Sequence, residues 1–328
     1  MNLRWLTGFT GSNGLALVGP DVRRFVTDFR YLSQADTEVA AAWTHEIATD
    51  LFEQIVKDLP ARVGFDDQQL TVKQLARLEE LVGDAAELVA AGGIVEDLRL
   101  VKDGEEIEKI RAAALLADES LLEVLADGIV GRTERDVAIA LEFAMRRRGA
   151  SGPSFPSIVA SGPHGALPHA TPRDVPIPPD VLVTIDYGAV LDGYASDCTR
   201  TFATGELDPR DRAVYDLVLL AQEEALAAVR PGPLGKEVDA VARSIIESAG
   251  HAEHFGHGLG HGVGLEVHEG PRLSKQGDTA LATGHVVTVE PGVYIPGHAG
   301  VRIEDLVAVT EDGHDVLSSL PKDLQIVQ

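Results

Sequence analysis

Residues 181–203, VLVTIDYGAVLDGYASDCTRTFA, contain two strand-like apolar runs on either side of a turn signal at Asp192-Gly193. Each run carries one carboxylate, because Asp186 ends the first run and Asp197 lies on the returning arm. Strand interiors disfavour acidic residues, so both positions need an explanation. The turn places the two carboxylates within about one diagonal neighbour of each other across the ladder. We therefore predict a β-hairpin that brings two acids together.

The pattern recurs further along the chain, at residues 285–309, HVVTVEPGVYIPGHAGVRIEDLVAV. Here Glu290 ends the first run and Glu304 follows the second, and a loop at 296–297 places the two nearly opposite each other. Two helical segments precede each hairpin, over 103–126 and 133–148, then over 208–229 and 234–249. Two helices and a hairpin, twice over, predict two pseudo-symmetric halves packed face to face.

The first 98 residues differ from this repeat, because short strand-like and helix-like segments alternate there. We expect strands at 15–18, 24–27 and 62–65, helices at 31–42, 50–59 and 72–81, and a connector over 94–101. The predicted organisation is α+β, with a small α/β domain over 1–98 and a larger domain over 99–328.

Composition excludes several classes of function. The chain has 28 Lys and Arg against 52 Asp and Glu, a net charge of −24, which argues against nucleic acid or an anionic membrane as a partner. The single cysteine, Cys198, permits neither an intrachain disulfide nor a thiolate zinc site. No signal peptide opens the sequence, and no apolar run approaches the ~20 residues of a membrane span, so we expect a cytoplasmic protein.

Four carboxylates that converge from two apolar hairpins repel one another strongly unless cations compensate them. Two divalent metal ions would formally cancel the four charges. The simpler alternative is that some of these acids face solvent, or that one pairs with Arg200 or Arg302. The matching positions in a repeat favour the metal interpretation.

Histidines supply candidate nitrogen ligands. Residues 256–268, GHGLGHGVGLEVH, include His257, His261 and His268, and the interleaved glycines argue against a helical metal-binding pair. Dense glycine predicts backbone close to a ligand or a metal, the alternative being a flexible loop with incidental histidines. A further candidate is His169, which follows a strand-like segment at 155–160, although a lone histidine there is more often a surface residue.

In order along the chain, Asp186, Asp197, His261, Glu290 and Glu304 resemble the five-ligand dimetal site of the pita-bread metallopeptidases, which include methionine aminopeptidases, Xaa-Pro aminopeptidases and prolidases. Their contexts match as well, among them IDYGA, SDCTR, GHGVGL, VEPG and RIED. Residues 2–13, NLRWLTGFTGSN, are similar to the opening of the N-terminal domain in the Xaa-Pro peptidase and creatinase branch. Relatives usually carry a strand and a helix upstream of this motif, so we expect either a domain shortened at its start or a start that is assigned late.

The resemblance implies roles for individual residues. Asp197 and Glu304 would bridge two metals, Asp186 would complete one shell, and His261 with Glu290 the other. Further implied site residues are Glu290 as a proton shuttle, His169 and His268 as proton donors or hydrogen-bond partners to the substrate, His257 as a further active-site histidine, and Arg302 as the residue that orients the carboxylates.

The implied function is removal of the N-terminal residue from peptides with proline in the second position, through a metal-bridging hydroxide, by an Xaa-Pro aminopeptidase or dipeptidase. The oxygen and nitrogen ligands suit Mn²⁺, Co²⁺, Fe²⁺ or Zn²⁺, and we expect Mn²⁺ first. The resemblance also implies a peptide substrate with a free N-terminus and a homodimer. The alternatives are a metal-dependent hydrolase of another small C–N substrate on the same fold, and a non-catalytic peptide-binding scaffold, which the full ligand set argues against.

Overall fold

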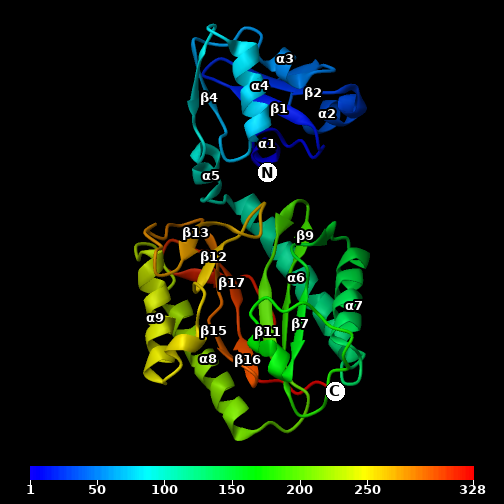
Figure 1. The fold of residues 1–328 in the computed structure, drawn as a ribbon, viewed down its shortest axis with the longest axis vertical. Coiled ribbons are helices and arrows are strands. Elements are labelled where there is room, and N and C mark those ends of the chain that lie inside the picture. Colours follow the sequence, from blue (N-terminus) through cyan, green and yellow to red (C-terminus); the bar gives the residue numbers. More distant parts are fainter. The chain divides into compact units, whose positions relative to one another are not determined.

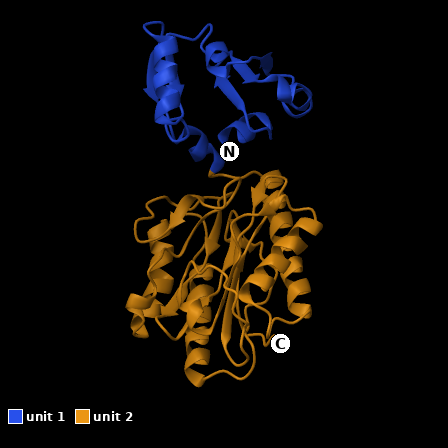
Figure 2. Cartoon of the chain, turned by 45° about the vertical axis from the view of Figure 1, so that its right-hand side comes forward, with its two compact units in different colours: residues 1–99 blue, residues 100–328 orange.

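The computed structural model describes residues 1–328, which form two compact units, Met1–Arg99 and Leu100–Gln328 (Figure 2). No helix in either unit combines the length and the apolar character that crossing a membrane requires.

The first unit is a small α/β structure. Its strands are β1 (Gly14–Val18), antiparallel to β2 (Arg23–Thr27), which pairs in parallel with β3 (Thr44–Ile47), and a separate parallel pair of β4 (Arg62–Phe65) and β5 (Glu87–Ala90). Its helices are α1 (Asn2–Thr7), η1 (Phe29–Tyr31), α2 (Leu32–Glu38), α3 (Leu51–Ile55), α4 (Val72–Val82) and α5 (Ile94–Arg99).

Three expectations for this unit are wrong in their extent. The helix expected over 31–42 ends at Glu38, because Val39 is extended and the chain turns into β3. The helix expected over 50–59 ends at Ile55, before Asp58 adopts a positive φ of 57°. The expected connector over 94–101 contains helix α5.

In the second unit, four long helices begin within one residue of their expected starts. They are α6 (Gly104–Ala126), α7 (Glu134–Arg147), α8 (Pro209–Ala227) and α9 (Gly235–Ser248). A capping box explains the first start, since the Asp103 side chain accepts from Glu106 N and the Glu106 side chain accepts from Asp103 N. Thr133 and Asp208 cap α7 and α8 by a single side-chain oxygen each, which accepts from Asp136 N and from Arg210 N.

The first predicted hairpin is present but broken in the middle. The structure has β8 (Leu182–Tyr187) against β11 (Cys198–Ala203), and β9 (Ala189–Leu191) against β10 (Tyr194–Ala195). The register places Asp186 opposite Thr199 and continues unchanged to the turn. At the break, a Cβ on Gly188 would lie 2.0 Å from the carbonyl oxygen of Ser196, so only glycine fits. Outside the hairpin, β7 (Ile158–Ser161) extends the first sheet, β6 (Gly152–Pro153) extends the second, and η2 (Gly162–Ala166) follows β7.

The second hairpin repeats this break. Its ladders are β14 (Val286–Val289) against β17 (Asp305–Val309), and β15 (Gly292–Ile295) against β16 (Ala299–Arg302). Both registers place Glu290 opposite Glu304, as the loop position predicts. The larger sheet runs β13-β12-β14-β17-β18 and adds β12 (Gly260–Gly262), β13 (Glu269–Leu273) and β18 (His314–Val316), with η3 (Ala252–His254) upstream.

The two halves pack as the repeat predicts. Helices α6 and α7 flank one side of the strands and α8 and α9 the other (Figure 1). Each helix pair shares a buried core with its own hairpin. The halves meet where β11 lies beside β16 and the start of β17. There, Glu304 N donates to Thr199 O at 3.1 Å and the Thr201 hydroxyl donates to Arg302 O at 2.9 Å.

Candidate metal centre

All four predicted acids lie at or beside the breaks in the two hairpins. Asp186 is the last but one residue of β8, and Asp197 immediately precedes β11. Glu290 follows β14, and Glu304 lies between β16 and β17. Because the ladders are interrupted at these points and the halves meet there, the four side chains gather in one interior region. Asp197 is only 6% exposed and Glu304 only 1%.

The ligand atoms form two overlapping groups. One oxygen each from Asp186, Asp197 and Glu304 lies within 4.8 Å of the others, and the same holds for one atom each from Asp197, His261 and His268. Glu290 belongs to neither group, although its Oε1 lies 3.3 Å from His261 Nε2. Asp197 is thus shared by both groups.

The burial of these carboxylates calls for compensating cations. Burial raises the pKa of Asp197 and Glu304 well above the usual range, and neighbouring carboxylates raise both further. Burial also raises the pKa of Asp186, against the opposing charge of Arg302. Asp186 Oδ1 and Glu304 Oε1 are buried without any hydrogen-bond partner. Unpartnered oxygens among crowded acids are the donor set that a divalent metal ion satisfies.

One cation does reach the cluster, as the simpler alternative anticipates. Arg302 Nη2 donates to Asp186 Oδ2 at 2.6 Å, and its Nε donates to the Thr199 hydroxyl at 3.0 Å. That hydroxyl donates in turn to Glu304 Oε2 at 2.8 Å. Arg200 pairs with Asp305 at 2.8 Å instead, and it reaches Glu304 only at the backbone carbonyl. Arg302 therefore orients two acids but supplies only one positive charge.

His261 is oriented as a metal ligand. Its Nδ1 lies 3.0 Å from Gly262 O, and since a carbonyl only accepts, Nδ1 carries the proton. Nε2 is left to face Asp197 Oδ2 at 3.5 Å and Glu290 Oε1 at 3.3 Å. Burial lowers the pKa of His261, but its hydrogen bond to Glu290 and the charge there outweigh burial and raise it. The same contact holds the pKa of Glu290 at about 2, against burial. An Nδ1–H fixed by a carbonyl, with Nε2 facing acids, is the usual arrangement of a metal-binding histidine.

Of the three other predicted histidines, His268 contacts the ring of His261. The His268 ring centroid lies 4.3 Å from that of His261, and His169 is exposed on the segment after η2. Burial lowers the pKa of both His257 and His268, and the charge of His169 lowers both further, so His169 lies within electrostatic reach of both rings. His257 Nδ1–H donates to Gly258 O at 2.7 Å, and its Nε2 accepts from the Tyr294 hydroxyl at 2.9 Å.

Sequence reasoning missed Tyr294, which links two predicted residues. Its hydroxyl also accepts from Arg302 Nη1 at 2.8 Å, so a chain of hydrogen bonds runs from Asp186 through Arg302 and Tyr294 to His257. The available signal was position, because Tyr294 pairs with Gly300 and is therefore the diagonal neighbour of Arg302 across the ladder.

Two of the glycines at 256–268 lie tightly against neighbouring strands. A Cβ on Gly260 would lie 2.0 Å from Thr288 O, and one on Gly262 would lie 1.8 Å from Gly270 O. Their close neighbours are the backbones of the adjacent strands. Glycine is needed here so that β12 fits between β13 and β14 while it carries His261.

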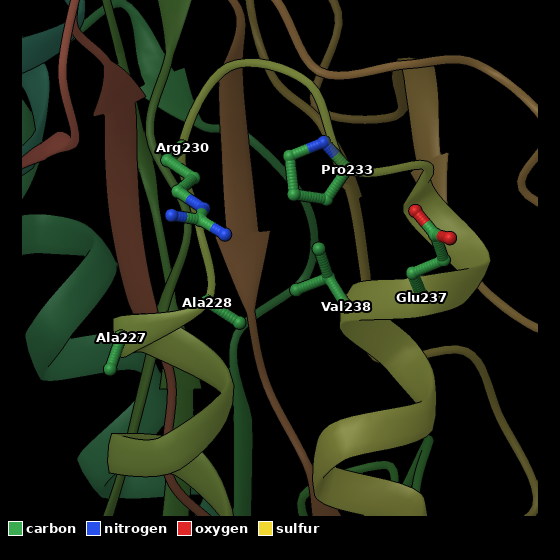
Figure 3. Close-up of a pocket in the computed structure, with 6 residues that line it drawn as sticks. All are labelled: Ala227, Ala228, Arg230, Pro233, Glu237 and Val238. Atoms are coloured by element: carbon green, nitrogen blue, oxygen red, sulfur yellow. The ribbon is translucent and has the colours of Figure 1, made fainter.

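A hollow elsewhere in this unit does not belong to the cluster. It lies between the end of α8 and the start of α9, and Figure 3 shows its lining residues, Ala227, Ala228, Arg230, Pro233, Glu237 and Val238. None of them is a predicted site residue, and the hollow holds no group of potential metal ligands.

The repeated helix–helix–hairpin fold and the buried carboxylate–histidine cluster define an α+β protein built around a candidate metal centre. Comparison with known proteins gives the family. Residues 108–311 match the model of metallopeptidase family M24, and residues 1–101 match that of the creatinase/prolidase N-terminal domain. The chain belongs to metallopeptidase family M24, which confirms the predicted pita-bread fold with its N-terminal α/β domain.

Three relatives match nearly the whole chain. The peptidase YqhT of Bacillus subtilis is 42% identical over 330 residues, covering 99% of this chain and 93% of its own length. A solved Xaa-Pro dipeptidase from Bacillus anthracis has a TM-score of 0.96 at 39% identity, covering 99% of this chain and 92% of that one. A solved X-Pro aminopeptidase from Thermotoga maritima has a TM-score of 0.93 at 36% identity, and the match covers 99% of this chain and 93% of that one.

Proposed function

We propose that this chain is a metal-dependent Xaa-Pro peptidase, which hydrolyses the bond between an N-terminal residue and a following proline. The observation that carries the proposal is the near-complete match to structures named as an Xaa-Pro dipeptidase and an X-Pro aminopeptidase. The buried cluster supplies the required chemistry, since two groups of potential ligands share Asp197. The two relatives differ in the stated class of substrate, so dipeptides and longer peptides are both candidates.

We assign the metal ligands as the family resemblance implies. Asp197 and Glu304 would bridge two divalent ions, Asp186 would complete the first site, and His261 with Glu290 the second. The buried oxygens of Asp186 and Glu304 that lack hydrogen-bond partners support this assignment, and so does His261 Nε2, which faces Asp197 and Glu290 while Nδ1 is held by Gly262 O. Mn²⁺ is our first choice for an oxygen-rich set with one nitrogen.

Bound divalent ions would lower the pKa of a water molecule and polarise the scissile carbonyl. The protein's own groups must then move one proton, because proline leaves as a secondary amine whose nitrogen has no hydrogen in the peptide. We assign this proton to Glu290, as the family resemblance implies: Oε1 accepts from the Thr288 hydroxyl at 3.1 Å, and Oε2 would take a proton from water and return it to the leaving nitrogen.

The histidines divide into two roles. His268 has a pKa lowered by burial, so at neutral pH it is uncharged and keeps one N–H to donate to the carbonyl oxygen. We assign the same role to the exposed His169. His257 has both ring nitrogens engaged by Gly258 and Tyr294, so we assign it to hold Tyr294 and, through it, Arg302.

The experiment compares an Xaa-Pro dipeptide with an Xaa-Pro tripeptide, using chelated enzyme, Mn²⁺-restored enzyme and an Asp186→Ala variant. An Xaa-Ala tripeptide is the control for proline specificity. Metal-dependent cleavage of the Xaa-Pro tripeptide defines an aminopeptidase, and cleavage of the dipeptide alone defines a dipeptidase. If metal-loaded protein cleaves neither, the proline proposal fails and other small amides become the substrates to test.

We also propose a cytoplasmic homodimer with residues 1–98 as the N-terminal domain and 99–328 as the catalytic domain. The family resemblance supports the dimer, and the single cysteine, buried as a free thiol, is consistent with a reducing compartment. Sedimentation equilibrium over a concentration series tests the dimer, and a constant monomer mass would exclude it.

A further inference from the structure

A second buried carboxylate lies outside the metal centre. Glu134, the first residue of α7, is 0% exposed and accepts hydrogen bonds from three residues. The donors are Ser161 N at 2.9 Å, the Ser161 hydroxyl at 2.8 Å, His164 Nδ1 at 2.9 Å, Arg173 N at 3.1 Å, Arg173 Nε at 3.0 Å and Arg173 Nη2 at 2.9 Å. The Glu134 side chain thus anchors both ends of the segment 161–173 by hydrogen bonds.

That segment carries His169. Its middle is held by the other half of the unit, because Arg302 Nη1 donates to Pro168 O at 3.3 Å. A Cβ on Gly300 would lie 1.8 Å from Gly165 O, so the backbones of the segment and β16 are in direct contact. His169 follows Pro168 directly and is exposed. Its position therefore depends on the two ends at Glu134 and on the contact with β16.

The arrangement at Glu134 requires a carboxylate. Every group that faces its two oxygens is an N–H or O–H donor, and a carboxylate offers only acceptors. Burial opposes the charge, but the hydrogen bonds from Arg173 and Ser161 outweigh it and hold the pKa of Glu134 at about 2. Glutamine has the same shape but would turn an NH₂ group towards Arg173 or Ser161. Glu134→Gln therefore disrupts the hydrogen bonds that anchor the segment 161–173 without opening a cavity.

We propose that Glu134 is a positioning residue, which holds the segment 161–173 so that His169 is placed at the substrate side of the metal centre. The inference rests on the proposed function, in that His169 contacts the substrate. His164 belongs to the same set of hydrogen bonds, since its Nδ1–H donates to Glu134. His169 is therefore the histidine of this segment that we assign to contact the substrate.

The first test is independent of catalysis. Amide hydrogen exchange of residues 162–172 is compared in the wild type, Glu134→Gln and the matched control Glu142→Gln. Glu142 lies on the same helix and accepts one backbone bond, from Ser157 N at 3.2 Å, outside the segment. We expect at least tenfold faster exchange in the Glu134 variant alone. Unchanged exchange would overturn the proposal.

The second test is a double-mutant cycle on cleavage of an Xaa-Pro peptide by Mn²⁺-loaded enzyme. We expect Glu134→Gln to lower kcat about 10–100-fold with little change in bound metal, and to cause no further loss in a His169→Ala background. Equal losses in both backgrounds would mean that Glu134 does not act through His169. If Glu134→Gln does not fold, Arg173→Gln replaces it, because it removes the two side-chain bonds at one end of the segment and leaves the bonds from Ser161, His164 and Arg173 N.

The two tests separate this inference from the proposed function. A wild type that cleaves no Xaa-Pro peptide contradicts the proposed function, and with it the placement of His169 for that reaction. In that case, the hydrogen-exchange comparison still tests whether Glu134 holds the segment 161–173 in place.

Discussion

The Arg302 guanidinium and the Asp186 carboxylate form an ion pair at 2.6 Å, and both groups are largely buried. The pair joins the two halves of the catalytic unit, since Arg302 ends β16 and Asp186 lies in β8. Arg302 also donates to Thr199 and Tyr294, and contacts in several fixed directions need the planar fork of arginine. The geometry leaves Asp186 Oδ1 free while Oδ2 is held.

The first prediction concerns this pair. Arg302→Lys keeps the charge but loses the separate contacts to Asp186, Thr199 and Tyr294. We expect metal affinity to fall about 10–100-fold, as for other residues that orient metal ligands. Calorimetric titration with Mn²⁺ measures it, and Arg111→Lys on the surface is the control. An unchanged dissociation constant would show that Asp186 does not depend on Arg302 for its orientation.

The second prediction concerns the hydroxyl of Tyr294. Tyr294→Phe keeps the buried ring but leaves His257 Nε2 and Arg302 Nη1 without their shared partner. We expect a loss of about 1–3 kcal/mol in the free energy of unfolding and a lower kcat. Urea denaturation and steady-state kinetics measure the two effects. If stability falls and kcat does not, the hydrogen-bond chain is structural only.

Local signals explain why much of the fold is predictable from the sequence. The capping box at Asp103 and Glu106 sets the start of α6, and the turn residues set the register of both hairpins. The acids are visible because carboxylates are rare in apolar strands. Their convergence is visible only because the pattern occurs twice.

What the sequence does not reveal depends on contacts between distant segments. The break at Gly188 follows from the close approach of Ser196, which no local propensity encodes. Strands β3 and β5 were also missed, and each pairs in parallel with a strand from which a helix separates it along the chain. Tyr294 and Glu134 carry no recognisable signal in the sequence. Their roles follow from the fold, which brings Arg302 next to Tyr294 and the segment 161–173 next to Glu134.

The third prediction concerns pH and His285. Burial, with a smaller effect of Lys102, lowers the pKa of this histidine from 6.5 to about 4. The unfolded chain binds the proton more readily, so stability is fully present above pH 6.5 and is lost as the pH falls towards 4. The loss is about 3 kcal/mol at most. Denaturant titrations at pH 7 and pH 4.5 measure the change in the free energy of unfolding between the two pH values. This change should be smaller in His285→Asn than in the wild type, and an equal change in both proteins would contradict the assignment.

The fourth prediction concerns metal removal. Without a cation, burial and mutual repulsion raise the pKa of Asp197 and Glu304, so the folded protein holds protons that the unfolded chain releases. Metal-free protein therefore loses stability as the pH rises above about 4. Metal binding displaces these protons, so the rise in Tm caused by Mn²⁺ should grow from pH 5 to pH 8. Scanning calorimetry of chelated and Mn²⁺-loaded protein measures it, and Asp197→Asn should reduce the gain.

The fifth prediction tests whether the break in the first hairpin places the acids. In Gly188→Ala the new Cβ would meet Ser196 O at 2.0 Å and the Ser154 hydroxyl oxygen at 2.2 Å. The backbone of Ser196 must move, and Asp197 is the next residue. We expect a loss of roughly 1–3 kcal/mol in the free energy of unfolding, together with weakened metal binding.

Gly104→Ala is the matched control, because a Cβ added there, at the start of α6, would meet no atom within 4 Å. Alanine at this position should be neutral or stabilise the helix by up to about 1 kcal/mol, with metal binding unchanged. Denaturation and Mn²⁺ titration of both variants separate two effects. If Gly188→Ala loses stability but binds Mn²⁺ as tightly as the control, the break is a packing feature and Asp197 is held by the strand that follows it.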